Sequence, residues 1–106
     1  PHMSNAVRLD LNKLEQQLGA FGYQWLAACA HFEMLHPEVT DRLGDELAAT
    51  LRTNMSLDFD ERAAFYSLPW MRQAHIPPAY RVVLKEQLDP AALPVLRRIQ
   101  EVASTN

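Results

Sequence analysis

Large apolar residues recur at alternating steps of three and four over the first third of the chain. The row consists of Leu11, Leu14, Leu18, Phe21, Trp25, Ala28, Phe32 and Leu35. Because seven residues make nearly two turns of an α-helix, these side chains share one helical face. The pattern predicts a long N-terminal helix that Pro37 ends, since the residue before a proline is pushed out of the helical region. Gly19 and Gly22 interrupt the row, and we expect them to bend this helix or to let another helix approach closely.

Prolines and capping residues divide the rest of the chain into shorter helices. Pro37 and Pro78 suit the first turn of a helix, and Asp58 with Glu61 has the spacing of a capping box. Pro94 would clash with the carbonyl four residues before it, so a short turn at 90–93 is expected ahead of the last helix. The predicted helices run from Pro37 to about Thr53, from Asp58 to about Leu68, from Pro78 to about Leu88 and from Pro94 to about Val102.

No segment alternates apolar and polar residues for long enough to predict a strand. The expected fold is therefore all-α, with four to five helices in a bundle-like or orthogonal array led by the long N-terminal helix. A chain of 106 residues fits a single helical domain, which we place at residues 3–103. Pro1 and His2 precede Met3 and are interpreted as a cloning scar, and residues 104–106 are expected to fray.

The net charge of −3 argues against general binding to nucleic acid, which needs clustered Lys and Arg. The charge is unevenly distributed, since residues 31–61 carry a net −6 and residues 70–100 a net +3. Two interpretations stay open. The two segments attract each other within one fold, or the basic segment faces an acidic partner.

The chain is expected to be cytoplasmic. Its lone Cys29 excludes an intramolecular disulfide and suits a reducing compartment. No charged and then apolar leader follows Met3. The longest uncharged stretch, from Gln16 to about Ala30, is too short and too polar to span a bilayer.

Nothing in the sequence predicts an enzyme, a metal site or a cofactor. Cys29, His31 and His36 are close in sequence, but their spacing spreads them around a helix instead of bringing them together. The acidic group that includes Asp58 and Glu61 is better explained as helix capping than as an acid/base pair. A glycine-rich phosphate loop, a G-x-S-x-G motif and a dinucleotide-binding fingerprint are all missing from the sequence.

Two segments are candidates for binding a protein partner. The first is the start of the apolar row, where Leu11, Leu14, Leu18 and Phe21 form a narrow stripe that suits one flat contact, with a second copy or with a regulator. The second is the proline-rich segment 68–80, which carries Trp70, Arg72 and Tyr80, residue types enriched at binding hot spots. The alternatives are that later helices cover the whole stripe and that Trp70 folds into the core.

The opening helix LNKLEQQLGAFGYQWLAACAHF, the length of about a hundred residues and the mild acidity resemble the small all-α bacterial anti-activators of the QslA type. That resemblance implies binding to a LuxR-type quorum-sensing regulator and a block of its dimerisation or DNA binding. No functional residue can be carried over, because the likeness contains no diagnostic motif. A small helix-turn-helix DNA-binding regulator, or another small helical inhibitor such as a phage-borne or immunity protein, remains as an alternative.

Overall fold

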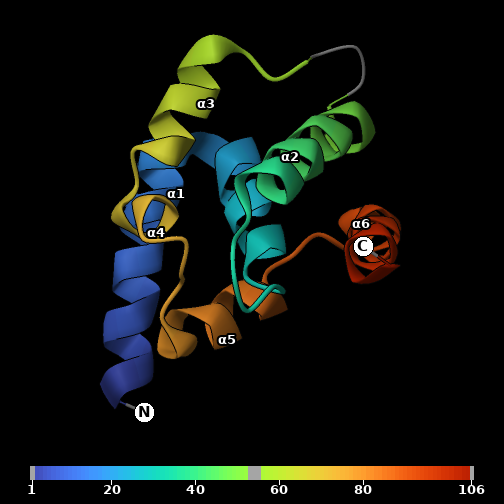
Figure 1. Cartoon of the computed structure of the whole chain (residues 1–106). Coiled ribbons are helices and arrows are strands. Elements are labelled where there is room, and N and C mark those ends of the chain that lie inside the picture. Colours follow the sequence, from blue (N-terminus) through green and yellow to red (C-terminus); the bar gives the residue numbers. More distant parts are fainter. Residues whose placement is uncertain (1, 53–55, 106) are drawn as a thin grey trace.

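The computed structural model describes residues 2–52 and 56–105. Its helices are α1 (His2–Cys29), α2 (Pro37–Leu51), α3 (Phe59–Tyr66), α4 (Pro69–Arg72), α5 (Pro78–Glu86), a 3₁₀ turn η1 (Pro90–Ala92) and α6 (Leu93–Thr105). No strand occurs within the described ranges. The prediction of an all-α fold led by a long N-terminal helix is confirmed (Figure 1).

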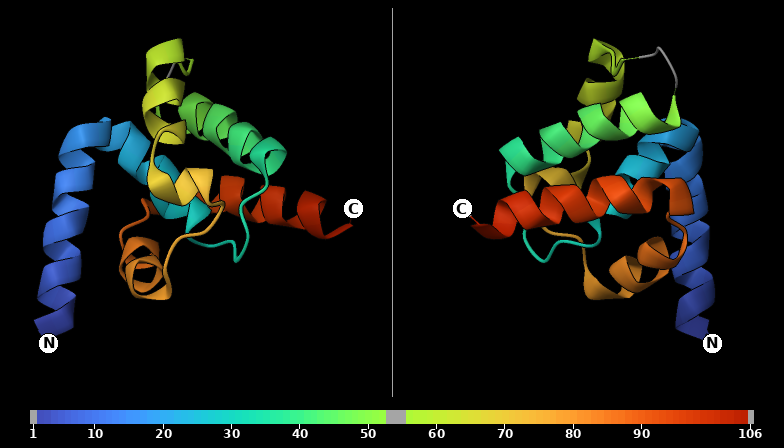
Figure 2. Two further views of the ribbon diagram at one scale, coloured as in Figure 1. Left: turned by 60° about the vertical axis from the view of Figure 1, so that its left-hand side comes forward. Right: turned by 90° about the vertical axis from the view of Figure 1, so that its right-hand side faces the viewer.

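Helix α1 is bent at Gly19, which confirms one of the two roles expected of the glycines. Gly19 has φ 82° and ψ 170°, a combination that is essentially restricted to glycine. The bend separates an N-terminal arm, residues 2–18, from a second segment, residues 20–29. Figure 2 shows the arm standing along one side of the molecule while the second segment runs into its centre.

The core is organised around the fully buried side chain of Trp25 in the second segment of α1. Its indole stacks on Phe65 of α3, with ring centroids 3.7 Å apart and planes only 6° apart. The edge of Tyr66 meets the same indole, and Nε1 of Trp25 donates a hydrogen bond to the carbonyl of Thr40 at 3.0 Å. Trp25 therefore joins α1, α2 and α3 into one unit.

The first helix ends at Cys29, earlier than the sequence pattern predicted. Tighter i→i−3 bonds follow, in which the amides of His31 and Phe32 donate to the carbonyls of Ala28 and Cys29. Nε of Arg81 in α5 donates to the carbonyl of Ala30 at 3.1 Å and satisfies one of the carbonyls left free at the helix end. Arg81 thus ties the end of α1 to α5.

The remaining helices largely follow their predicted starts. Asp58 and Glu61 form the predicted capping box at the start of α3, and the expected short turn before the last helix is η1. The four-residue helix α4 lies between α3 and α5, where the sequence predicted no helix. Thr53, the predicted end of the second helix, lies outside the described residues, as do Pro1 and Asn106, whereas α6 continues to Thr105.

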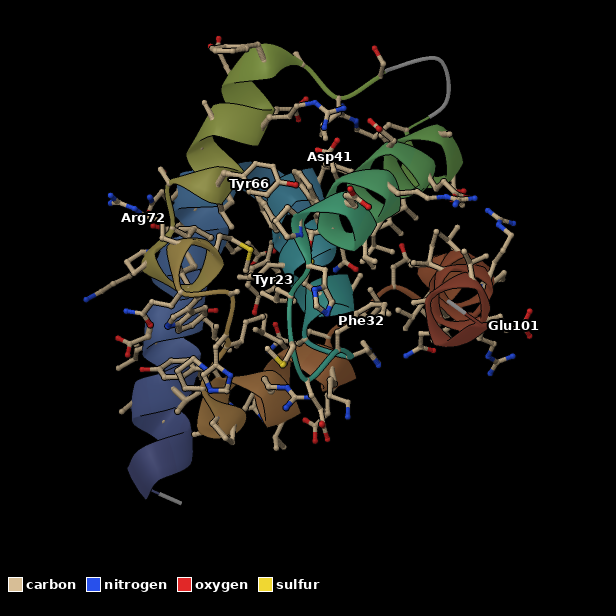
Figure 3. The ribbon with its side chains drawn as sticks, viewed as in Figure 1. Tyr23, Phe32, Asp41, Tyr66, Arg72 and Glu101 are labelled. Atoms are coloured by element: carbon tan, nitrogen blue, oxygen red, sulfur yellow. The ribbon has the colours of Figure 1, made fainter. Side chains whose placement is uncertain are left out.

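Helix α5 packs along α1, and α6 packs against α2 (Figure 2). Glu46 of α2 accepts a hydrogen bond from Nε of Arg98 in α6 at 3.1 Å, an ion pair that joins the acidic segment to the basic one. On the other side of α2, Arg62 of α3 pairs with Asp41 and Asp45. Figure 3 shows Asp41 and Tyr66 facing each other between the same two helices. Across the described residues, no helix is long and apolar enough to cross a membrane.

Candidate protein-binding groove

A groove of about 310 Å³ runs between the arm of α1 and the segment around α4. Its arm side and its α4 side contribute the residues Asp10, Lys13, Leu14, Gln17, Leu68, Pro69, Trp70 and Tyr80. These two sides are more than fifty residues apart in sequence. The bend at Gly19 brings them together, because it sets the arm alongside the later helices.

The arm side of the groove is one face of the helix. Asp10, Lys13, Leu14 and Gln17 follow at helical spacing, so their side chains project in the same direction. Leu14 is half-buried and packs on the core. Asp10, Lys13 and Gln17 are exposed and supply the polar rim.

The opposite side is aromatic. Trp70 and Tyr80 are both half-buried, and their ring centroids lie 4.8 Å apart at an angle of 53°. Leu68, which is 4 % exposed, closes the floor beneath them. Pro69 and Pro78 open α4 and α5, and each restricts the backbone shortly before one of the two aromatic residues. This side is thus prepared for contact before a ligand arrives.

One hydrogen bond connects the two sides. The hydroxyl of Tyr80 donates to Oδ2 of Asp10 at 2.6 Å. This bond stabilises the protonated hydroxyl and, together with partial burial and the negative charge of Asp10, raises the pKa of Tyr80 above its ordinary value. The hydroxyl of Tyr80 thus links α5 to the arm across the groove.

The structure brings together three of the seven residues predicted to bind a partner. Leu14, Trp70 and Tyr80 line the groove. Leu18 is half-buried against the core, and the exposed Arg72 extends from the outside of α4 without lining the groove (Figure 3).

The expectation that Leu11 and Phe21 lie on a binding surface is corrected. Leu11 is 1 % exposed and Phe21 is 9 % exposed, so both belong to the core of a single chain. The physical reason is the bend at Gly19. It lets the apolar faces of both halves of α1 turn inward, where Leu11 and Phe21 join the same buried cluster.

Sequence reasoning missed the polar and proline members of the groove. Asp10, Lys13 and Gln17 could have been found from their helical spacing to Leu14. Leu68 and Pro69 fall within the candidate segment 68–80 but were not singled out in it. No local signal in the sequence showed that the two candidate segments face each other.

A second hollow lies between the start of α2 and the end of α6. Two adjoining depressions share Glu38, Val39 and Ala103, with volumes of about 480 and 140 Å³. They lack the aromatic residues that distinguish the groove. We therefore take the groove beside Trp70 as the candidate site.

The residues that suggested metal or thiol chemistry lie in separate surroundings. Cys29 is fully buried beside Thr40, and burial raises the pKa of its thiol well above the ordinary range. His31 is half-buried, and burial together with Lys85 and Arg81 lowers the pKa of its imidazole. Among the described residues, no three His, Cys, Asp or Glu side chains gather in a way that could hold a metal ion.

Comparisons with known proteins add no assignment, since no protein-family model, no curated protein and no solved structure matches this chain.

Proposed function

We propose that this chain regulates another protein by binding it through the groove beside Trp70. The observation that carries the proposal is the position of Trp70 and Tyr80, which pack against the core but stay only half-buried and line the groove with Leu14. Half-buried aromatic residues in a preformed hollow supply most of the binding energy at many interfaces. An apolar side chain of the partner would enter between Leu14 and Trp70 and displace water from both.

The rim of the groove favours a partner segment that carries both apolar and acidic side chains. Lys13 forms no ion pair with any described residue and can attract a carboxylate of the partner. Asp10 is held by Tyr80. An amphipathic helix or loop with an acidic residue beside its apolar anchor has the chemistry that this rim and floor would recognise.

In its specific form, the proposal is that the partner is a LuxR-type transcription regulator in the bacterial cytoplasm. The chain would act as an anti-activator that blocks dimerisation or DNA binding of the regulator. This part rests on the resemblance in length, helical content and acidity. Another small helical inhibitor or an immunity protein would use the same groove on a different target.

The alternative of a helix-turn-helix DNA-binding regulator finds less support. Arg81 donates to the carbonyl of Ala30, and Arg98 is paired with Glu46. These two cations of the basic segment are engaged within the fold and are less available for phosphate contacts.

The test is isothermal titration calorimetry of this chain against a purified LuxR-type regulator, with two matched alanine variants. Trp70→Ala removes the aromatic side of the groove and should raise the Kd by about thirtyfold, as expected for a hot-spot residue. Phe59→Ala removes another aromatic ring, 82 % exposed on α3 and away from the groove, and should leave the Kd unchanged.

The two parts of the proposal fail in different ways. If no LuxR-type regulator binds, the anti-activator role is wrong. If a regulator binds with the same affinity to Trp70→Ala as to the wild type, the groove is not the contact surface. A gel shift of random duplex DNA that is reversed by salt would instead favour the DNA-binding alternative.

A further inference from the structure

The arm of α1 is joined to the rest of the chain by a single non-helical residue, Gly19. All its other attachments are non-covalent. Val7 and Leu11 are buried, at 8 % and 1 % exposure, and Asp10 accepts the hydrogen bond from Tyr80. An identical set of contacts would form if the arm of a second copy occupied this place.

The apolar row keeps its phase through the bend. Leu14 and Leu18 before Gly19 continue into Phe21 and Trp25 after it with the same alternation of four, three and four residues. Where two helical segments meet at an angle, the apolar residues of one need not continue the helical repeat of the other, because each segment can be rotated independently onto the core. In a continuous helix the apolar residues must keep one repeat along the whole length to stay on the same face. The sequence is therefore compatible with a straight α1 as well as with the bent one.

No neighbouring atom crowds the place of a side chain at Gly19, so the backbone angles alone demand glycine there. A Cβ atom built on Gly19 would meet nothing within 4 Å. The angles φ 82° and ψ 170° are essentially forbidden to residues with a Cβ. Rotation of this one exposed residue into the helical region would straighten α1 and carry the arm away from α5.

We propose that a second copy of this chain is a partner, through exchange of the arm. In the exchanged dimer α1 is straight, and the arm of each protomer packs on α5 of the other. Leu11 of each arm is then buried in the other protomer, and Asp10 accepts the hydrogen bond from the hydroxyl of Tyr80 of that protomer. The dimer gains the helical hydrogen bonds that the bend interrupts, and its cost is the entropy of association. Such exchange of an element across a hinge is a common route to symmetric dimers.

The inference does not rest on the proposed function, because it is tested on the isolated chain. The decisive variant is Gly19→Ala, measured by size-exclusion chromatography with light scattering and by small-angle X-ray scattering. Alanine at position 19 strains the bent state and favours the helical one. The equilibrium constant between bent and straight α1 should therefore shift toward the straight form by on the order of a hundredfold in each chain. The neighbouring variant Ala20→Gly adds flexibility without forbidding the bend, and it should elute like the wild type.

A mixing experiment shows whether the arms have exchanged. A nitroxide is attached to Asn12→Cys on the exposed side of the arm, in chains that also carry Gly19→Ala. Cys29 is fully buried and does not take the label. These chains are unfolded and refolded together with ¹⁵N-labelled Gly19→Ala chains. In an exchanged dimer the nitroxide of one copy should broaden the α5 amide signals of the other.

Each outcome decides the proposal. A Gly19→Ala dimer with broadened α5 signals supports arm exchange. A folded monomer whose scattering radius equals that of the wild type overturns it, as does an unfolded chain, because the straight arm then finds no stable site. A dimer without broadening on α5 associates through another surface and also overturns it.

Discussion

Gly44 of α2 lies directly against the indole of Trp25. A Cβ atom built at position 44 would lie 2.5 Å from both Cε2 and Cζ2 of the indole, a separation that real Cβ contacts do not show. Both residues are buried, and Trp25 is also clamped by Phe65 from the other side. The absence of a side chain at Gly44 therefore sets how closely α2 approaches the second segment of α1.

The first prediction is that Gly44→Ala destabilises the fold by about 1–3 kcal/mol, the usual cost of overpacking a core. The gain in helix propensity, about 1 kcal/mol, does not compensate, because Phe65 stacks on the indole and limits its movement. Urea unfolding followed by tryptophan fluorescence measures the change. Thr50→Ala, at an exposed site of the same helix, is the control and should change stability by less than about 0.5 kcal/mol.

The second prediction concerns the cap of α3. Oδ1 of Asp58 accepts from the amide of Glu61 at 2.7 Å, and the amide of Asp58 donates to Oε1 of Glu61 at 3.2 Å. Asp58→Ala should cost about 1 kcal/mol in the free energy of unfolding. Asp60→Ala removes an equal charge from the same helical turn without removing the cap. Equal losses in the two variants would mean that charge near the helix end, and not the cap, matters.

The third prediction is a pH dependence that Glu61 causes. A hydrogen bond from Arg52 holds the pKa of Glu61 below its ordinary value of 4.5, even though partial burial acts in the opposite direction. Because the folded pKa is the lower one, this contribution to stability is present above pH 4.5 and is lost as the pH falls through the folded pKa. Glu61→Gln retains an oxygen for the cap but loses the charge. Wild type should exceed it in stability at pH 7, and the difference should shrink as the pH falls below 4.5 through the folded pKa; a constant difference contradicts the argument.

The helices were predictable because their signals are local. The capping box of Asp58 and the prolines that open α2 and α5 act within one helical turn, so they appear in the sequence as fixed spacings. The early end of α1 was not predictable. The carbonyl of Ala30, just beyond that end, is bound by Arg81 from fifty-one residues away, and no local pattern encodes such a contact.

The groove was predictable in its parts but not in its assembly. Composition alone drew attention to Trp70 and Tyr80, and periodicity drew attention to Leu14. That they face each other follows from the sharp bend at Gly19, whose direction no local pattern encodes. The same bend explains the error at Leu11, since a straight helix would have left that residue to be covered by a partner.

The fourth prediction concerns the thiol of Cys29. It is fully buried, and burial raises its pKa, so the reactive thiolate is rare in the folded state. Ellman's reagent should therefore react at pH 8 roughly a thousandfold more slowly with the native chain than with the chain in urea. A native rate close to the unfolded rate would show that the second segment of α1 opens readily.

The last prediction separates core from groove within the arm. Leu11 is 1 % exposed, so Leu11→Ala leaves a cavity and should lower the free energy of unfolding by about 2–5 kcal/mol. Leu14 is half-buried at the edge of the groove, where water fills the space that its side chain leaves. Leu14→Ala should accordingly cost only about 1 kcal/mol, since little apolar area leaves the core. Both changes remove the same atoms from the same helix, so helix propensity cancels in the comparison. Urea unfolding gives the two values. Equal losses would mean that Leu14 belongs to the core like Leu11, and the groove would then lack its arm side.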